Sequence, residues 1–383
     1  MRYSLFVGCG ALVAMGPVAA QRATIDASAP AAMYRVLVAM HDGASETRAE
    51  AMLDSVLDTR AYTIMFHHYN RVWRPNHLPR AVFRDMILSL AFPARYSAGT
   101  NQRADQMLPV WRTYYGDLAV YEKNLRQLDD TNLQAMVQQA VGVAQSWLPA
   151  GWTIPDFEVV ILPSGGSKAF SIDTAQGYDF LQLPRDSARN IQWDDLRSTI
   201  AHESHHTGQR AAIPSAMTAA DSVAYRFLTL FTAEGTATKF VNDFPGGCVP
   251  RIDPTRRDPA FSPEVASWWA RYTPQERDLM DHFVATFESA RTGKVTSDSL
   301  TAEMGAVWLN GYVSPVYFIG SELYGAVYVG FGKPGLFTVM RDARDLPPMY
   351  NEAVRKNPRL LGSCVLFPDS AVRHAEALGR ERK

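Results

Sequence analysis

The sequence has almost no net charge and no long run of charge of one sign. Its 38 Lys and Arg residues balance 39 Asp and Glu residues, so the formal net charge is -1. Proteins that bind nucleic acid or anionic membranes through electrostatics concentrate positive charge on one surface. The composition therefore gives no reason to expect either partner, and it leaves the oligomeric state open. Because 47% of the 383 residues are hydrophobic, the chain can bury a large core, which predicts a soluble globular protein.

The sequence also lacks internal repeats, a heptad pattern and low-complexity linkers. These absences argue against a solenoid, a coiled coil or a long disordered segment. Apolar residues instead recur at spacings of three and four, which is typical of amphipathic helices. We therefore expect a mainly α (α+β) fold, with an N-terminal helical region over residues 21–150. The segments of this region that show the pattern are residues 31–40, 46–57, 78–90 and 131–148.

Cysteine is scarce, and the first of the three cysteines lies in an N-terminal segment with the pattern of a signal peptide. Arg2 gives this segment a positive start, residues 5–18 are mostly apolar, and the Val-Ala-Ala at residues 18–20 is a small-residue cleavage motif. A membrane helix is the competing interpretation, but the run is short for spanning and contains Gly-Pro. We expect residues 1–20 to be removed and the mature chain to be exported, periplasmic or secreted, without stable membrane insertion.

Export changes how the remaining cysteines are interpreted. Cys248 and Cys364 each lie in a glycine-containing segment, and an oxidising compartment favours a disulfide between them. Two free, buried thiols are the alternative. A cysteine protease is disfavoured, because neither residue has a neighbouring feature that would activate a thiolate.

The most informative motif is the pentapeptide HESHH, which contains the spacing HExxH. It lies in residues 193–207, whose apolar positions predict a helix, and Gly208 is placed to end that helix. On a helix His202 and His206 lie one turn apart on one face, where they can bind the same metal ion, and Glu203 can reach a water on that metal. The simpler alternative, surface or capping histidines, leaves Glu203 unexplained.

A third ligand is then needed, because a catalytic zinc site usually has three protein ligands and leaves the fourth position to water. The apolar, helix-like residues 225–240 contain one acidic residue, Glu234, which is costly to bury unless it is paired or metal-bound. Gly235 beside it would let this helix approach the helix of the HExxH motif closely. Glu234 is the expected third ligand, and an ion pair with a basic residue is its alternative role. His205 and Glu322 are the rival ligands.

The sequence AHESHH, followed by a helix that carries AEGTA, resembles the gluzincin pattern, in which two histidines and a glutamate from a following helix bind zinc. More narrowly, residues 157–353 are similar to uncharacterised bacterial families of zinc-dependent peptidases. One departure is that Glu234 lies 28 positions after His206, farther than in the best-known gluzincins. The resemblance implies a zincin-like core over residues 151–383, with a small sheet above the metal helix and one zinc ion per chain.

Short apolar runs at residues 157–162 and 178–183, each followed by proline, predict two strands. In zincin-like folds an edge strand of the small sheet pairs with extended substrate backbone. Residues 167–172 are the expected edge, which would bind a peptide or protein substrate by strand addition.

The predicted reaction is zinc-dependent hydrolysis of a peptide bond, with Glu203 as the general base. Tyr317 is the expected donor to the oxyanion, and Tyr312 and Tyr324 are its rivals. Two alternative functions remain at this point. One is an exported binding or scaffold protein on a zincin-like frame, and the other is zinc-dependent hydrolysis of a non-peptide amide or ester.

Overall fold

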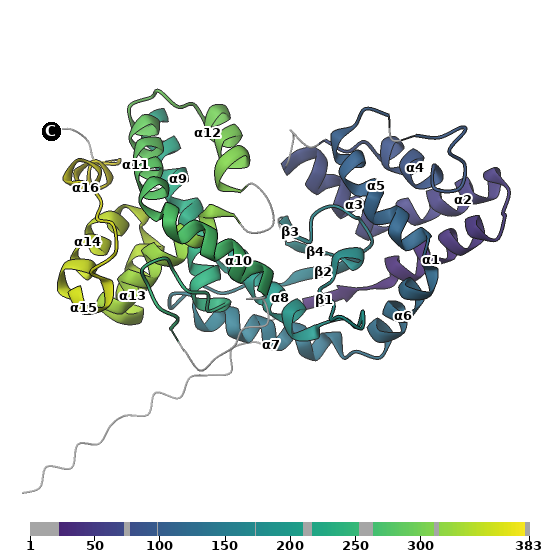
Figure 1. Cartoon of the computed structure of the whole chain (residues 1–383), viewed down its shortest axis with the longest axis horizontal. Helices are drawn as coiled ribbons and strands as arrows, with labels where there is room; N and C mark the ends of the chain where they lie inside the picture. Colours follow the sequence, from purple (N-terminus) through teal and green to yellow (C-terminus); the bar gives the residue numbers. More distant parts are fainter. Residues whose placement is uncertain are drawn as a thin grey trace, which may run out of the picture.

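The structure, a computed structural model, is mainly helical with one four-stranded sheet, which confirms the predicted α+β class (Figure 1). The predicted signal peptide and Tyr312 lie outside the described residues. No helix within the described part of the chain is long and apolar enough to span a membrane. The structure describes residues 23–72, 77–97, 99–172, 174–209, 217–252, 263–309 and 314–379.

Most of the N-terminal helices, coloured purple to blue in Figure 1, gather on one side of the sheet. Their formation follows the apolar spacing: in α2, Ala49, Leu53 and Val56 are all buried. The predicted helix 46–57 has the bounds of α2, and the other three predicted segments agree with helices whose ends differ by a few residues. The elements are α1 (Ser28–His41), α2 (Glu46–Leu57), α3 (Arg60–His67), η1 (His68–Val72), α4 (Arg80–Leu88), α5 (Gln102–Tyr115), α6 (Leu118–Asp129) and α7 (Leu133–Ser146).

The sheet has the strand order β1-β2-β4-β3. Strands β1 (Ala23–Asp26), β2 (Phe157–Leu162) and β4 (Ala175–Asp179) run parallel, whereas β3 (Ala169–Ile172) pairs antiparallel with β4 at one edge. The predicted strand 157–162 and the predicted edge within residues 167–172 are confirmed as β2 and β3. Strand β1 was not predicted, because its four residues are too few to show the alternation of apolar and polar residues that is typical of a strand.

The predicted strand 178–183 is wrong in its bounds. The strand ends at Asp179, and Phe180–Gln182 form a 3-10 turn. The buried Asp179 side chain accepts hydrogen bonds from the backbone amides of Ser164 and Leu181, so it caps the turn and stops the strand. An apolar run alone cannot distinguish a strand from a buried turn of this kind.

The C-terminal helices, green to yellow in Figure 1, lie on the other side of the sheet from α1 to α6. Gly235 of α9 does make a close approach, but to α13 and not to the HExxH helix as predicted: a β-carbon on Gly235 would lie 2.6 Å from the Cα of Gly320. The elements are α8 (Trp193–Gly208), α9 (Ala219–Thr236), η4 (Ala237–Val241), α10 (Pro263–Tyr272), α11 (Glu276–Arg291), α12 (Ser297–Glu303), η6 (Met304–Trp308), α13 (Pro315–Arg341), α14 (Leu346–Lys356), α15 (Pro358–Leu361) and α16 (Asp369–Glu376).

The predicted disulfide is confirmed: Cys248 and Cys364 are bonded, with their Cα atoms 5.2 Å apart. The bond joins the loop after η4 to the C-terminal segment. Lys239 also holds this loop, because its ammonium donates hydrogen bonds to the backbone carbonyls of Phe244 (3.0 Å) and Pro250 (2.5 Å). Burial lowers the pKa of Lys239 to about 7. Its role in the described structure is to hold the loop.

Candidate metal centre

Helix α8 has the predicted extent and presents the HExxH motif along one edge. Its buried face includes Leu196, Ile200 and Ala201, which fixes the rotation of the helix. Gly208 ends it as expected, where a β-carbon would lie 2.3 Å from Leu148 Cδ1. The predicted helix and its end are therefore confirmed.

The structure brings together the three residues that were predicted to bind the metal. The candidate ligand atoms of His202, His206 and Glu234 all lie within 4.8 Å of one another. Glu234 Oε2 is 3.3 Å from His202 Nε2 and 3.3 Å from His206 Nε2. Glu234 comes from the last turn of α9, so two helices supply the group.

Charge balances within this group of residues. Burial alone raises the pKa of Glu234, but His206 and His202 outweigh it and hold the carboxyl pKa well below its usual range. Conversely, burial lowers the pKa of His206 and the Glu234 carboxylate more than compensates, so that this pKa rises to about 9. Without a metal, the site is stabilised as an imidazolium–carboxylate pair. A cation at this place would take over the role of the proton.

Asn242 orients His202, and the sequence analysis missed it. Its Oδ1 lies 2.6 Å from His202 Nδ1, while its Nδ2 donates to Ser198 Oγ at 2.8 Å and to the Ser198 carbonyl at 3.3 Å. Because the amide nitrogen faces acceptors, the amide oxygen accepts from Nδ1–H of His202, which leaves the Nε2 lone pair for a metal. The one signal in the sequence is a polar residue directly after the apolar Phe240-Val241 pair.

Glu203 faces the edge of the sheet. Ser171, on β3, donates its hydroxyl hydrogen to Glu203 Oε2 at 2.5 Å. This bond holds one carboxylate oxygen and leaves Oε1 to interact with a water or a substrate. The candidate base therefore lies between the candidate metal ligands and the edge strand. Ser171 fell inside the predicted edge segment, but no sequence signal pointed to its contact with Glu203.

Neither rival ligand belongs to this group. His205 is fully buried, with Nε2 3.3 Å from the Trp147 carbonyl and Nδ1 accepting from Gln209 at 3.1 Å. Burial lowers the pKa of His205 to about 3. Glu322 is buried elsewhere, where Tyr350 donates to its Oε1 at 3.0 Å. Both residues therefore make their contacts away from His202, His206 and Glu234.

Two of the candidate tyrosines can be placed. The ring of Tyr317, in the first turn of α13, lies 6.2 Å from the His202 ring between centroids. Tyr324 is fully buried and its hydroxyl is 2.5 Å from Thr232 Oγ1, which makes it a core residue. Tyr317 is therefore the tyrosine next to the site within the described residues.

A pocket of about 270 Å³ opens beside the ligands and is lined in part by His206, Glu234 and Trp152. Two histidines and a glutamate on one helix, completed by a carboxylate from the next, form the arrangement of an HExxH metal site. The chain belongs to the family described as "Putative zinc dependent peptidase (DUF5700)", which matches residues 53–359. Comparison with curated proteins and with solved structures finds no match.

Proposed function

We propose that this protein is an exported zinc-dependent metallopeptidase that hydrolyses peptide bonds. The observation that carries the proposal is the convergence of His202, His206 and Glu234 within 4.8 Å, with Glu203 held beside them at the edge strand. The family description supports zinc-dependent peptidase activity in general. The mechanism and the role of each residue are our proposal.

The donor set fits zinc. Imidazole nitrogen and carboxylate oxygen are both ligands that zinc accepts, and three protein ligands leave a coordination position for water. The orientation of His202 by Asn242 is the kind of support that ligating histidines receive in zinc proteins. We therefore assign one zinc ion per chain to these three residues.

When bound, zinc acts as a Lewis acid and lowers the pKa of a water molecule from 15.7 to about 7. The remaining steps use side chains of the protein. Glu203 accepts the proton of the attacking water through Oε1, because Oε2 is held by Ser171, and then delivers that proton to the leaving amine. Tyr317 donates a hydrogen bond to the oxygen that becomes negative as the carbonyl is attacked.

The substrate backbone would bind along β3. This strand is at the edge of the described sheet, and it carries Ser171 within hydrogen-bond distance of Glu203. An extended peptide that pairs with β3 would therefore pass directly by the base and the metal ligands. Strand addition recognises the backbone, so this part of the site favours an unstructured segment of a peptide or protein.

Export is part of the proposal. Residues 1–20 have the pattern of a signal peptide, and a Cys248–Cys364 disulfide is typical of proteins that fold in an oxidising compartment. Mass spectrometry of exported protein should find Gln21 as the first residue and the disulfide intact. An uncleaved N-terminus in exported material would contradict the proposal.

Two measurements test the activity itself. Purified mature protein should contain about one zinc per chain, and it should cleave an unstructured protein in a reaction that a chelator stops and added zinc restores. Zinc well below one per chain after zinc-replete expression would contradict the assignment. Binding without cleavage would favour the binding-protein alternative, and hydrolysis restricted to small amides or esters would favour a non-peptide hydrolase.

A further inference from the structure

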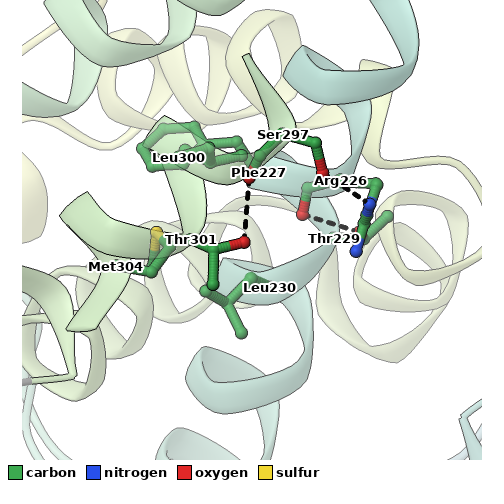
Figure 2. A pocket seen from close by; sticks show the side chains of 8 residues that line it. All are labelled: Arg226, Phe227, Thr229, Leu230, Ser297, Leu300, Thr301 and Met304. Carbon is green, nitrogen blue, oxygen red and sulfur yellow. Dashed lines mark hydrogen bonds between the residues drawn. The ribbon is translucent and has the colours of Figure 1, made fainter. Parts of the chain in front are cut away.

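A second pocket lies next to the metal centre and has no part in the proposed chemistry. It is formed by side chains of α9 on one side and of α12 and η6 on the other (Figure 2). Thr229 lines both this side pocket and the pocket that contains His206 and Glu234. The two pockets therefore adjoin at Thr229 on α9.

The side pocket is mostly apolar. Phe227, Leu230, Leu300 and Met304 line it, and its volume is about 290 Å³. An apolar cavity of roughly 150 Å³ can hold a benzene ring, so the side pocket can hold one leucine or phenylalanine side chain. A basic side chain would lose hydration there without meeting a carboxylate among the lining residues, and the one cation of the lining, Arg226, already donates to Ser297. The walls thus select for large apolar groups.

The two walls of the side pocket are connected before any ligand binds. Arg226 of α9 donates from Nη1 to Ser297 Oγ, at the start of α12, over 3.1 Å. Figure 2 shows this contact at one end of the pocket, with Thr301 and Met304 farther along α12 and η6. Thr296 and Ser299 form a capping box that fixes the beginning of α12. Contacts within the protein therefore form the side pocket, and its shape does not depend on a bound ligand.

The position of the side pocket fits an extended substrate. Leu230 precedes Glu234 by four residues, so the two lie on one face of α9, about 6 Å apart along the helix axis. Extended peptide advances roughly 3.3 Å per residue. A substrate whose carbonyl lies at the metal centre would therefore reach the side pocket with a residue about two positions away.

We infer that the side pocket is a specificity subsite, which binds a large apolar side chain, aliphatic or aromatic, located about two residues from the cleaved bond. This inference rests on the proposed peptidase function and adds a substrate class to it. Backbone pairing with β3 would bind the peptide whatever its sequence, whereas the side pocket would determine which side chain is accepted at one position.

The experiment uses soluble peptides in which one leucine is moved along a chain of small residues. Wild-type protein should cleave the peptide with leucine at one position, about two residues from the cut, more efficiently than its glycine counterpart, by on the order of 10- to 100-fold in kcat/KM. Thr301→Trp, at an exposed residue of the pocket, should fill the space and abolish this preference. Ala302→Trp, at the next exposed residue but outside the pocket lining, should keep it.

Peptide binding to the Glu203→Gln variant separates recognition from cleavage. In that background the leucine peptide should bind more tightly than the glycine peptide, and Thr301→Trp should remove the difference. Leucine-independent cleavage by the wild type, or equal effects of the two tryptophan variants, would overturn the subsite while the peptidase function stands. If no peptide is cleaved in a Glu203-dependent way, the proposed function fails and the subsite fails with it.

Discussion

Two groups of potential metal ligands occur in the described residues, and they differ in charge. One is His202, His206 and Glu234, and the other is Cys248, Glu276 and Glu322; in both groups the candidate atoms lie within 4.8 Å of one another. The first combines two bases with one acid, so its members stabilise one another's charges. The second combines two carboxyl groups with a sulfur that is already bonded to Cys364.

The second group is a structural carboxyl pair. Burial, and then the nearby Glu276 carboxylate, raise the pKa of Glu322 well above its usual range, and burial also raises the pKa of Glu276. Gly247 lies between them, since a β-carbon there would be 2.3 Å from Glu276 Oε2 and 2.8 Å from Glu322 Oε2. A proton on the pair removes the repulsion. The comparison teaches that proximity of ligand atoms is not sufficient, and that complementary charge and an orienting partner distinguish the candidate metal centre from the second group.

The strongest test of this comparison is a matched pair of isosteric variants. Glu234→Gln replaces the one carboxylate among the three proposed ligands with a poor zinc ligand, so zinc and all activity should be lost. Glu322→Gln makes the same substitution of an amide for a carboxyl group in the second group, and this variant should retain about one zinc per chain. Metal analysis after dialysis measures both. Normal zinc in Glu234→Gln together with loss in Glu322→Gln would reverse the assignment.

The next largest effect separates base from ligand. Glu203→Gln should keep zinc and fold but lower kcat by about 10² to 10⁴-fold, because an amide cannot accept the proton of water. His202→Ala should instead lose the metal. Steady-state kinetics beside metal analysis distinguishes the two. Full activity in Glu203→Gln would show that another residue is the base.

The orienting partner should matter for affinity. Asn242→Ala removes the acceptor that fixes the His202 ring, so zinc affinity should fall by about 10- to 100-fold. Ser198→Ala removes only the hydroxyl that accepts from Asn242, and its effect should be smaller. Competition with a chromophoric chelator gives both affinities. An equal or larger loss in Ser198→Ala would mean that packing, and not ring orientation, sets the affinity.

Ser171 should affect the rate and leave the metal in place. Ser171→Ala removes the hydrogen bond that holds Glu203 Oε2, so the base loses its fixed position and kcat should fall by about 10-fold or more. Ser171→Thr retains the hydroxyl and should recover most of the rate. If Ser171→Ala raises KM alone, the serine contributes to substrate binding and does not position the base.

Local patterns predicted the parts of this molecule that depend on nearby residues. The HExxH helix, α2 and β2 follow from spacing alone, and the disulfide follows from two cysteines in a sequence whose N-terminus has the pattern of a signal peptide. Ser171 and Asn242 could not be predicted, because they meet Glu203 and His202 only through packing of segments 32 and 40 residues away. The close approach of Gly235 was expected, but its partner Gly320 is set by the tertiary fold. The end of β4 at Asp179 could not be predicted either, because it depends on a hydrogen bond with Ser164 that leaves no periodic pattern in the sequence.

The last prediction concerns the pH dependence of stability at the structural carboxyl pair. Because the folded-state pKa of Glu322 is raised above its unfolded value, the folded protein binds the extra proton. The associated stability is fully present below the unfolded pKa and is lost as pH rises toward the folded one, at up to about 1.4 kcal/mol per pH unit. Glu322→Gln is neutral at every pH and still offers an oxygen to the Tyr350 hydroxyl. Its free energy of unfolding should therefore increase relative to the wild type between pH 5 and pH 8 in urea titrations. A difference that stays constant with pH would show that the pair carries no shared proton, and Glu276 and Glu322 would then have to be reconsidered as ligands for a cation.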